Sequence, residues 1–224
     1  MRQVISPCEA YRRWAESFDS TDSPIIALES RHLASLLGDV AGKRLIDVGC
    51  GTGRWLVWTS ERGARVAGAD FSPEMLRAAT NKPGIAGRIV QADGRRLPFR
   101  DASAEVVLCT LALGHMQPVR EAMAELARLA APGGMVIVSD FHPDALRRGW
   151  KRTFRSGPEI VEIESEPYAL ADLANDGLCL VELREFRFGE PERPLFEKAG
   201  KGAMFAEACA LPAIVTARFL RRAP

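Results

Sequence analysis

The sequence predicts an α/β fold with a doubly wound, mainly parallel seven-stranded sheet, helices on both faces and a small cap made by insertions. Three observations lead to this prediction. Short apolar segments alternate with helical ones between residues 44 and 141, and a glycine-rich turn follows the first of these segments. The length of 224 residues also fits one domain of generous size.

Two helices are expected before the sheet. Apolar and aromatic residues recur at helical intervals over 8–18, and Ser-Thr-Asp-Ser-Pro at 20–24 ends that pattern. A second helix is expected over 25–37, where Gly38 and Gly42 end it and lead into the sheet.

The sheet and its helices are expected next. Before one helix, Ser72 can cap, Pro73 suits the first turn and Glu74 favours the positive end of the helix dipole. The segment 105–111 is nearly all apolar, as a strand buried on both faces should be. The expected strands are 44–48, 65–69, 87–92, 105–111 and 135–139, and the expected helices are 54–62, the segment after 72, and 119–130.

The last third of the chain has a different pattern. Partial alternation over 147–166 predicts an inserted strand or hairpin, 169–176 resembles a helix, and 189–211 is irregular. The last two strands are expected at 178–188 and 213–220, the final one antiparallel. One domain, 1–224, thus divides into a helical lid (1–40), a core (41–141) and two insertions on the substrate side (142–167 and 189–212).

The composition of the chain limits the kinds of partner that we expect the protein to bind. The net charge of +1 gives no field that would favour nucleic acid. No basic start precedes an apolar segment, and the longest apolar run is far too short to cross a bilayer, so we expect a cytoplasmic protein without a membrane partner. The five cysteines lack CxxC spacing, which argues against disulfides and against a metal site. A homodimer is left open.

The stretch LIDVGCGTGRW holds the glycine turn, with Gly49, Gly51 and Gly53. A dinucleotide fingerprint, GxGxxG, would need glycine at position 54, which is Arg54 here. Asp47 precedes the turn, and a carboxylate there suits a ligand that carries an ammonium group and no phosphate. The turn therefore favours an amino-acid-bearing nucleoside over a dinucleotide.

Aspartates end the second and third strands. Asp70 lies seventeen residues past Gly53 and can accept hydrogen bonds from both hydroxyls of a ribose, with a turn or capping role as the alternative. Asp93, in QADGRRLPF, could meet an exocyclic adenine amine or be a plain turn residue.

Residues 44–141 resemble the class I S-adenosylmethionine-dependent methyltransferases, of the small-molecule type with a Rossmann-like sheet. The resemblance rests on DVGCGTG and GADFSPEML together, and on QADGRRLPF, EVVLCTLALGHM and LAAPGGMVIVSD. YRRWAESFD resembles the helix that closes over the cofactor in many members. The resemblance implies transfer of a methyl group from S-adenosyl-L-methionine to an oxygen or nitrogen of a small-molecule acceptor by in-line displacement, with S-adenosyl-L-homocysteine as product.

The resemblance also implies a set of cofactor contacts. The glycine turn would approach the methionine portion, Asp47 and the carbonyl of Leu111 would lie near its ammonium, and Tyr11 would reach its carboxylate. At the nucleoside end, Asp70 would hold the ribose. The neighbours of ribose and adenine would be Phe71, Met75, Asp93 and Gly94.

Two histidines are candidates for catalysis. A base is needed only if the acceptor must lose a proton. His115 follows the fourth strand of the core and His142 the fifth, so both are expected at the mouth of the crevice. We hypothesise that one of them is the general base or a hydrogen-bond partner of the substrate; a loop histidine satisfied by the backbone is the alternative.

The insertions should select the acceptor. Their aromatic residues would line an apolar pocket or form the cap's own core: Trp150, Phe154, Tyr168, Phe196 and Phe205. A basic cluster would be a solvated face or a site for an anionic small substrate: Arg147, Arg148, Lys151, Arg152 and Arg155. After the fourth strand, CTLALGHM lacks the Pro-Pro-aromatic motif that stacks a flipped base, which favours a small acceptor over nucleic acid.

Competing functions remain at this point. A nicotinamide-dependent oxidoreductase could use a similar sheet, although Arg54 in place of a glycine counts against it. A non-catalytic S-adenosylmethionine-binding subunit, or a methyltransferase with a protein acceptor, would keep the same turn. Nucleotide binding and methyl turnover would separate these functions.

Overall fold

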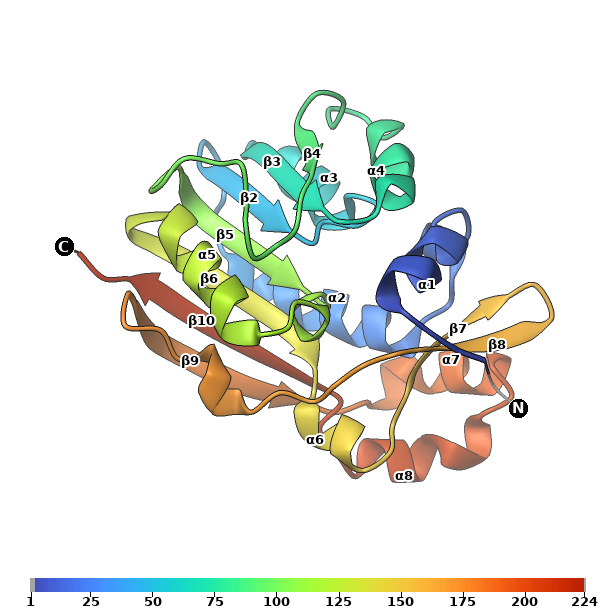
Figure 1. The fold of residues 1–224 in the computed structure, drawn as a ribbon. Helices are drawn as coiled ribbons and strands as arrows, with labels where there is room; N and C mark the ends of the chain where they lie inside the picture. The colour runs from blue at the N-terminus through green and yellow to red at the C-terminus, as the bar shows by residue number, and fades with distance from the viewer. Residues whose placement is uncertain (1–2, 224) are drawn as a thin grey trace.

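The computed structural model describes residues 3–223 and is built on a seven-stranded sheet (Figure 1). The strand order is β4-β3-β2-β5-β6-β10-β9, and β10 runs antiparallel to both of its neighbours, while the pairs from β4 to β6 are parallel. The predicted fold class and the antiparallel final strand are therefore confirmed. The strands are β2 Arg44–Val48, β3 Arg65–Asp70, β4 Ile89–Gln91, β5 Ala104–Thr110, β6 Ala130–Phe141, β9 Leu178–Phe186 and β10 Ile214–Arg221.

Helices cover both faces of this sheet (Figure 1). Neighbouring residues of a strand point to opposite faces, so Leu45 packs in the cluster with α2, α3 and α4, and Ile46 packs in the cluster with α5. Both layers are apolar, which explains why the central strands read as continuous hydrophobic runs. The helices are α2 Pro24–Leu37, α3 Arg54–Ser60, α4 Pro73–Thr80 and α5 Val119–Leu129.

Helix starts follow the capping signals in the sequence. Ser72 accepts a hydrogen bond from the Met75 amide at the start of α4, as predicted, and Ser23 caps α2 in the same way through Ile26. The first predicted helix is shorter than expected: α1 spans Pro7–Trp14, and a 3₁₀ turn, η1 Phe18–Ser20, follows it.

A second, three-stranded sheet joins the N-terminus to the first insertion. The predicted hairpin is present as β7 Arg152–Ser156 and β8 Glu159–Ile163, and β1 Gln3–Ile5 pairs in parallel with β8. Trp14 of α1 stacks on Phe154 of β7, with ring centroids 4.9 Å apart. The N-terminal lid and the hairpin therefore form one structural unit.

Two expectations for the C-terminal third were wrong. The segment 169–176 forms only a 3₁₀ turn, η3 Leu170–Leu173, because the turn Asn175–Gly177, closed by a side-chain bond from Asn175, interrupts the chain directly before β9. The segment 189–211 is helical in parts, since its prolines fall in first turns, where they are tolerated, and its aromatics are buried. The short helices after β6 are α6 Pro143–Arg147, η4 Glu190–Glu192, α7 Arg193–Lys198, η5 Gly202–Met204 and α8 Phe205–Cys209. Within residues 3–223, no helix combines the length and apolarity that a bilayer crossing requires.

Candidate functional site

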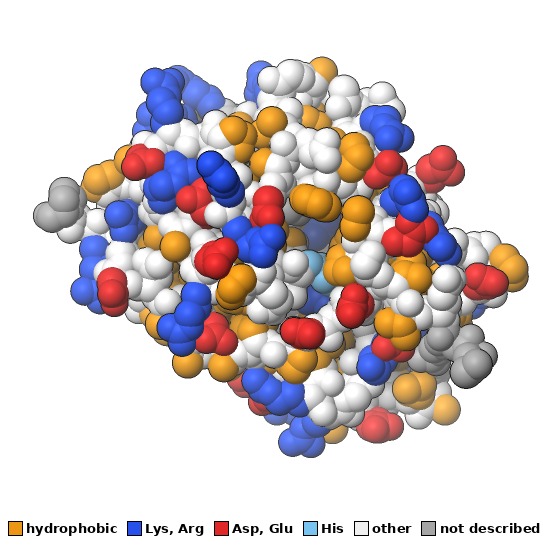
Figure 2. All heavy atoms as spheres, viewed as in Figure 1, with side chains coloured by type: hydrophobic (Ala, Val, Ile, Leu, Met, Phe, Trp, Pro, Cys, Tyr) orange, Lys and Arg blue, Asp and Glu red, His pale blue; other side chains and the backbone are white. Residues whose placement is uncertain are grey.

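A cavity of about 1180 Å³ lies at the carboxyl ends of the parallel strands. Its walls come from α1, the glycine turn, the ends of β3 and β5, the hairpin β7–β8 and the segment around α7. Figure 2 shows a hollow on this side of the molecule, with a histidine side chain (pale blue) at its bottom. Ligand sites of drug-sized molecules occupy roughly 300–1000 Å³, so this cavity has room for a nucleoside and a second ligand.

The glycine turn adopts backbone conformations that other residues rarely take. Gly49, Gly51 and Gly53 have φ angles of 72°, 55° and 78°. A Cβ on Gly49 would lie 2.5 Å from the Cβ of Ala112, so a larger residue there would displace the loop after β5. Gly49 and Gly51 line the cavity, whereas Gly53 lies behind them at the start of α3.

Arg54, which stands where a dinucleotide fold would have its third glycine, anchors the turn. Its guanidinium donates to Glu29 at 2.7 Å and to Ser30 at 2.6 Å, both on α2. Glu29 is fully buried and also accepts from Trp55 and Ser139. The arginine therefore fixes α3 against α2, which explains why this position is not a glycine.

Asp70 lies at the tip of β3, on the cavity wall. Its Oδ2 accepts from the Gly51 amide at 2.7 Å, and its Oδ1 accepts from the Ser72 amide at 2.8 Å. Because each carboxylate oxygen can accept a second hydrogen bond, Asp70 keeps the capacity to bind two hydroxyls. Burial raises the pKa of Asp70, and its backbone hydrogen bonds partly offset that rise.

Asp47 is buried below the glycine turn rather than on the cavity wall. Its side chain is 1% exposed, and its Oδ1 has no hydrogen-bond partner among residues 3–223. Burial raises the pKa of Asp47 to about 7, although the charge of Arg54 works in the opposite direction. A buried carboxylate oxygen without a hydrogen-bond partner is costly, so such an atom is typical of a site that is completed by a ligand.

Replacing Asp47 with asparagine should change how stability depends on pH. The folded protein keeps the Asp47 proton up to about pH 7, whereas an ordinary aspartate loses it near 3.8, so stability falls as pH rises between these values. The total loss is on the order of 4 kcal/mol. In urea unfolding at several pH values, Asp47→Asn should be more stable than the native protein above pH 7. The exposed Asp176→Asn is the control, and parallel pH profiles for native and Asp47→Asn proteins would contradict this account.

The loop after β4 forms another part of the cavity wall. Asp93 bonds to the backbone and side chain of Arg95, which lowers the pKa of Asp93, so it is a turn residue and also lies on the cavity. A Cβ on Gly94 would lie 2.4 Å from Sδ of Met116, a cavity residue that the sequence did not indicate. Phe71, 57% exposed, and the buried Met75 line the same region.

A buried polar network forms the floor between α1, β5, β6 and β7. Arg152 is paired with Asp140, which is fully buried, and its Nη1 donates to the Leu111 carbonyl at 3.0 Å. The same Nη1 lies 3.4 Å from Nε2 of His115, which is also 3.1 Å from the Tyr11 hydroxyl. The network therefore joins the lid, the hairpin and the strand ends at one point.

This network fixes the protonation of its members. A guanidinium only donates hydrogen bonds, so Nε2 of His115 is an acceptor and the ring proton is assigned to Nδ1. Burial and the charge of Arg152 hold the pKa of His115 well below its usual value, and burial raises the pKa of Tyr11 to about 12. Both side chains are therefore neutral at physiological pH.

Leu111 has a φ of 53°, which is unusual for a residue other than glycine. Its amide donates to the Ser139 carbonyl at 2.7 Å, and its own carbonyl accepts from Arg152, so both polar groups of its peptide backbone are held. Strain that the surroundings enforce in this way clusters at functional sites.

The structure brings only one of the two candidate histidines to the cavity. His142 is 1% exposed, does not line the cavity and caps α6, with Nδ1 accepting from the Asp144 amide at 3.1 Å. Its Nε2 lies 3.0 Å from Glu185. The expected position of His142 at the mouth of the crevice was therefore wrong, because the residue before Pro143 serves as a helix cap.

The lid is held over the glycine turn by Asp19, which follows α1. Asp19 accepts from Thr52 Oγ1 at 2.6 Å and pairs with Lys82 at 2.6 Å. Of the five aromatic residues expected to line a pocket or form the cap's core, three lie on the cavity: Trp150, Phe154 and Phe196. Phe205 packs behind Phe196, and Tyr168 is buried in the cluster with α5.

Comparison with known proteins identifies related chains. Residues 46–138 match a family described as "Methyltransferase domain". The demethylmenaquinone methyltransferase of Tropheryma whipplei (strain Twist) is 32% identical over 142 residues, which cover 59% of this chain and 58% of that protein. The chain thus aligns with somewhat more than half the length of this relative.

Two further proteins extend the comparison. The malonyl-[acyl-carrier protein] O-methyltransferase of Pectobacterium atrosepticum is 27% identical over 180 residues, covering 76% of this chain and 68% of that protein. An S-adenosylmethionine-dependent methyltransferase structure from Mesorhizobium loti shares the fold with a TM-score of 0.68 at 21% identity, and covers 89% of this chain and 100% of that chain.

Proposed function

Because this chain belongs to the class I S-adenosylmethionine-dependent methyltransferases, we propose that it transfers a methyl group to an oxygen or nitrogen of a small-molecule acceptor. S-adenosyl-L-methionine is the cofactor of this family. One observation carries the proposal: the cavity wall combines a tightly packed glycine turn with Asp70, and below the turn lies Asp47, whose Oδ1 has no partner within residues 3–223. This combination suits a nucleoside that carries an ammonium group.

The residues present fit this cofactor. Asp70 would bind the ribose hydroxyls, and the second lone pair of the Leu111 carbonyl would accept from the ammonium, whose charge would favour the ionised form of Asp47. Phe71 and Met75 would contact the nucleoside, with Asp93 and Gly94 at the adenine edge. Tyr11 would lie near the methionine carboxylate and would turn its single hydroxyl proton from Nε2 of His115 to that carboxylate when the cofactor binds.

The bound cofactor supplies an electrophilic methyl group on a positively charged sulfur, and the protein's task is positioning. The lid and hairpin would exclude water from the cavity, which favours a displacement in which charge disappears. The aromatic wall would orient the acceptor. No side chain of the chain needs to form a covalent bond.

His115 is proposed to act as a hydrogen-bond partner in this site rather than as a strong base. Its pKa lies well below the usual value, and Nε2 already faces the donors Tyr11 and Arg152. We expect His115→Ala to lower turnover about 10- to 100-fold, the effect of one lost hydrogen bond, and His142→Ala to lower stability with unchanged turnover. Turnover per folded molecule, scored by methyl transfer, separates the two. Equal losses in both variants would contradict the assignment of the site.

Calorimetric titration tests the proposed function. The native protein should bind S-adenosyl-L-methionine and S-adenosyl-L-homocysteine and should not bind NADH. The two sulfur ligands remaining silent while NADH binds would refute the proposal and favour an oxidoreductase. Binding of the sulfur ligands without methyl transfer to any acceptor would instead favour a non-catalytic subunit.

A further inference from the structure

We infer that the acceptor is an amphiphile with an apolar body and an anionic group, and that the anionic group binds at a cationic mouth between the hairpin β7–β8 and α7. This inference rests on the proposed function and adds a substrate class to it. The names of the relatives give acceptors as different as demethylmenaquinone and malonyl-[acyl-carrier protein], so the class must follow from the cavity of this chain.

The charge lining the cavity is unevenly distributed. Among residues 3–223, eight cationic side chains and four carboxylates line it, although the whole chain has a net charge of only +1. Two of the cations, Arg54 and Arg95, belong to the cofactor side. The other six come from the hairpin region and the segment around α7: Arg148, Lys151, Arg152, Arg155, Lys198 and Lys201.

Two of the four carboxylates that line the cavity lie away from this mouth. Asp70 and Asp93 lie on the cofactor side, which leaves Asp22 and Glu207 among the carboxylates that line the acceptor side. Asp22 pairs with Lys198, and Lys151 pairs with Glu162.

Two arginines of the mouth remain uncompensated. Arg148 and Arg155 are exposed, and neither has an ion-pair or side-chain hydrogen-bond partner within residues 3–223. A concave surface on which one sign of charge predominates concentrates its field and attracts ligands of the opposite sign. Arg152 differs from both, because it is buried and already paired with Asp140.

The mouth continues into an aromatic wall. Trp150 stacks on Phe188 with centroids 6.0 Å apart, and Phe188 contacts Phe196 edge to face at 4.9 Å; all three line the cavity. Trp150 also packs edge to face against Phe141, at the end of β6. An apolar body could therefore extend from the cations of the mouth along these rings to the strand ends, where the methyl donor would be bound.

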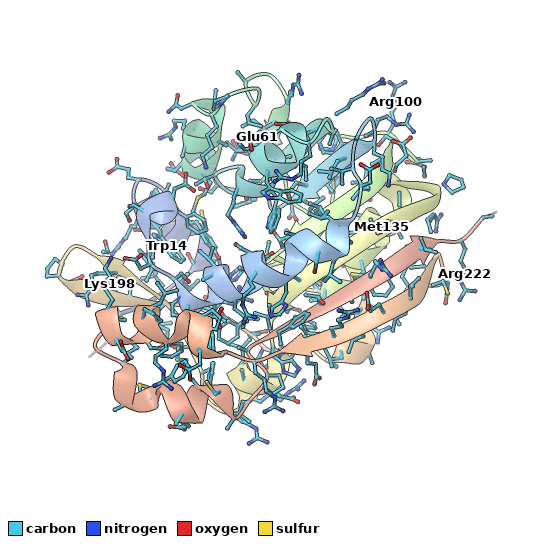
Figure 3. The ribbon with its side chains drawn as sticks, turned by 180° about the vertical axis from the view of Figure 1, so that it is seen from behind. Trp14, Glu61, Arg100, Met135, Lys198 and Arg222 are labelled. Atoms are coloured by element: carbon cyan, nitrogen blue, oxygen red, sulfur yellow. The ribbon has the colours of Figure 1, made fainter. Side chains whose placement is uncertain are left out.

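The ribbon views show how the hairpin, α7 and α1 lie relative to one another. The hairpin lies beside α7 in Figure 1 and again in the reverse view of Figure 3, where Lys198 is labelled near the hairpin. The hairpin in turn packs on α1 through Trp14, which Figure 3 also labels. The hairpin, which packs on the lid, thus also carries Arg155, one of the two arginines without a partner in the described chain.

Binding of simple amphiphiles tests this inference. The probes are octanoate, octyl phosphate and octanol, titrated calorimetrically into protein saturated with S-adenosyl-L-homocysteine. One or both anions should bind at least about tenfold more tightly than octanol. The stronger of the two identifies the anionic group as a carboxylate or a phosphate. Equal affinity for octanol and both anions would overturn the inference.

Charge reversal at the mouth provides the matched comparison. The double variant Arg148→Glu/Arg155→Glu should lose the preference for anions and keep its affinity for S-adenosyl-L-homocysteine, which also shows that it is folded. The control Arg88→Glu/Arg100→Glu changes the net charge equally at exposed positions away from the cavity. An equal loss in the control, or no loss in either variant, would overturn the inference. Failure of the native protein to bind S-adenosyl-L-homocysteine would instead refute the proposed function itself.

Discussion

Replacing Arg152 with alanine is expected to lower the free energy of unfolding by about 3–5 kcal/mol, because the change leaves a buried charge without its partner. Asp140 is fully buried and, among the described residues, would keep as donors the amides of Gly114, at 2.6 Å, and Phe141, at 2.8 Å. The carbonyl of Leu111 would also lose its hydrogen bond. Urea unfolding followed by fluorescence measures the effect.

Two further variants make this test specific. Arg155→Ala, on the same strand, removes an exposed arginine without a partner in the described chain and should change stability by less than about 0.5 kcal/mol. Arg152→Met/Asp140→Leu should recover much of the loss, because apolar residues can replace a buried ion pair. If Arg152→Ala is no less stable than Arg155→Ala, the buried pair does not hold the hairpin to the core.

Replacing Asp70 with alanine is expected to weaken the binding of S-adenosyl-L-homocysteine by about 100-fold or more. Each hydrogen bond to a charged group contributes roughly 1.5–3 kcal/mol, and the carboxylate is placed to accept two from the ribose. The variant also removes the acceptor of the Gly51 and Ser72 amides, which loosens the glycine turn. Calorimetric titration of the product nucleoside measures the loss.

The control for this prediction is Asp93→Ala, also on the cavity wall. Asp93 is already committed to Arg95, so its removal should weaken binding less than the removal of Asp70. Thermal unfolding of both variants shows whether either loss arises from unfolding. Native affinity in a folded Asp70→Ala protein would exclude Asp70 from the ribose site.

The strands and helices of the core were predicted from local signals in the sequence. These signals were sufficient to predict the sheet. The strand 44–48 was predicted with its observed bounds, and the cap at Ser72 and the start of α5 at Val119 were also found as predicted. Apolar periodicity, capping residues and glycine turns act over a few residues, so they can be read from the chain directly. The same holds for the position of the aspartates at the strand ends.

The sequence by itself determined the fold class, the glycine turn and the strand-end carboxylates, whereas only the tertiary structure decided which polar residues meet. His115 and His142 both follow neighbouring strands of the sheet, yet one faces the cavity and the other caps α6. Arg152 was one of five basic residues, and its role became clear only because the pairing of β1 with β8 and the stacking of Trp14 on Phe154 place β7 over the strand ends. Such contacts join residues that lie far apart in the chain and depend on burial and electrostatics. The spacing of residues along the sequence carries no signal for them.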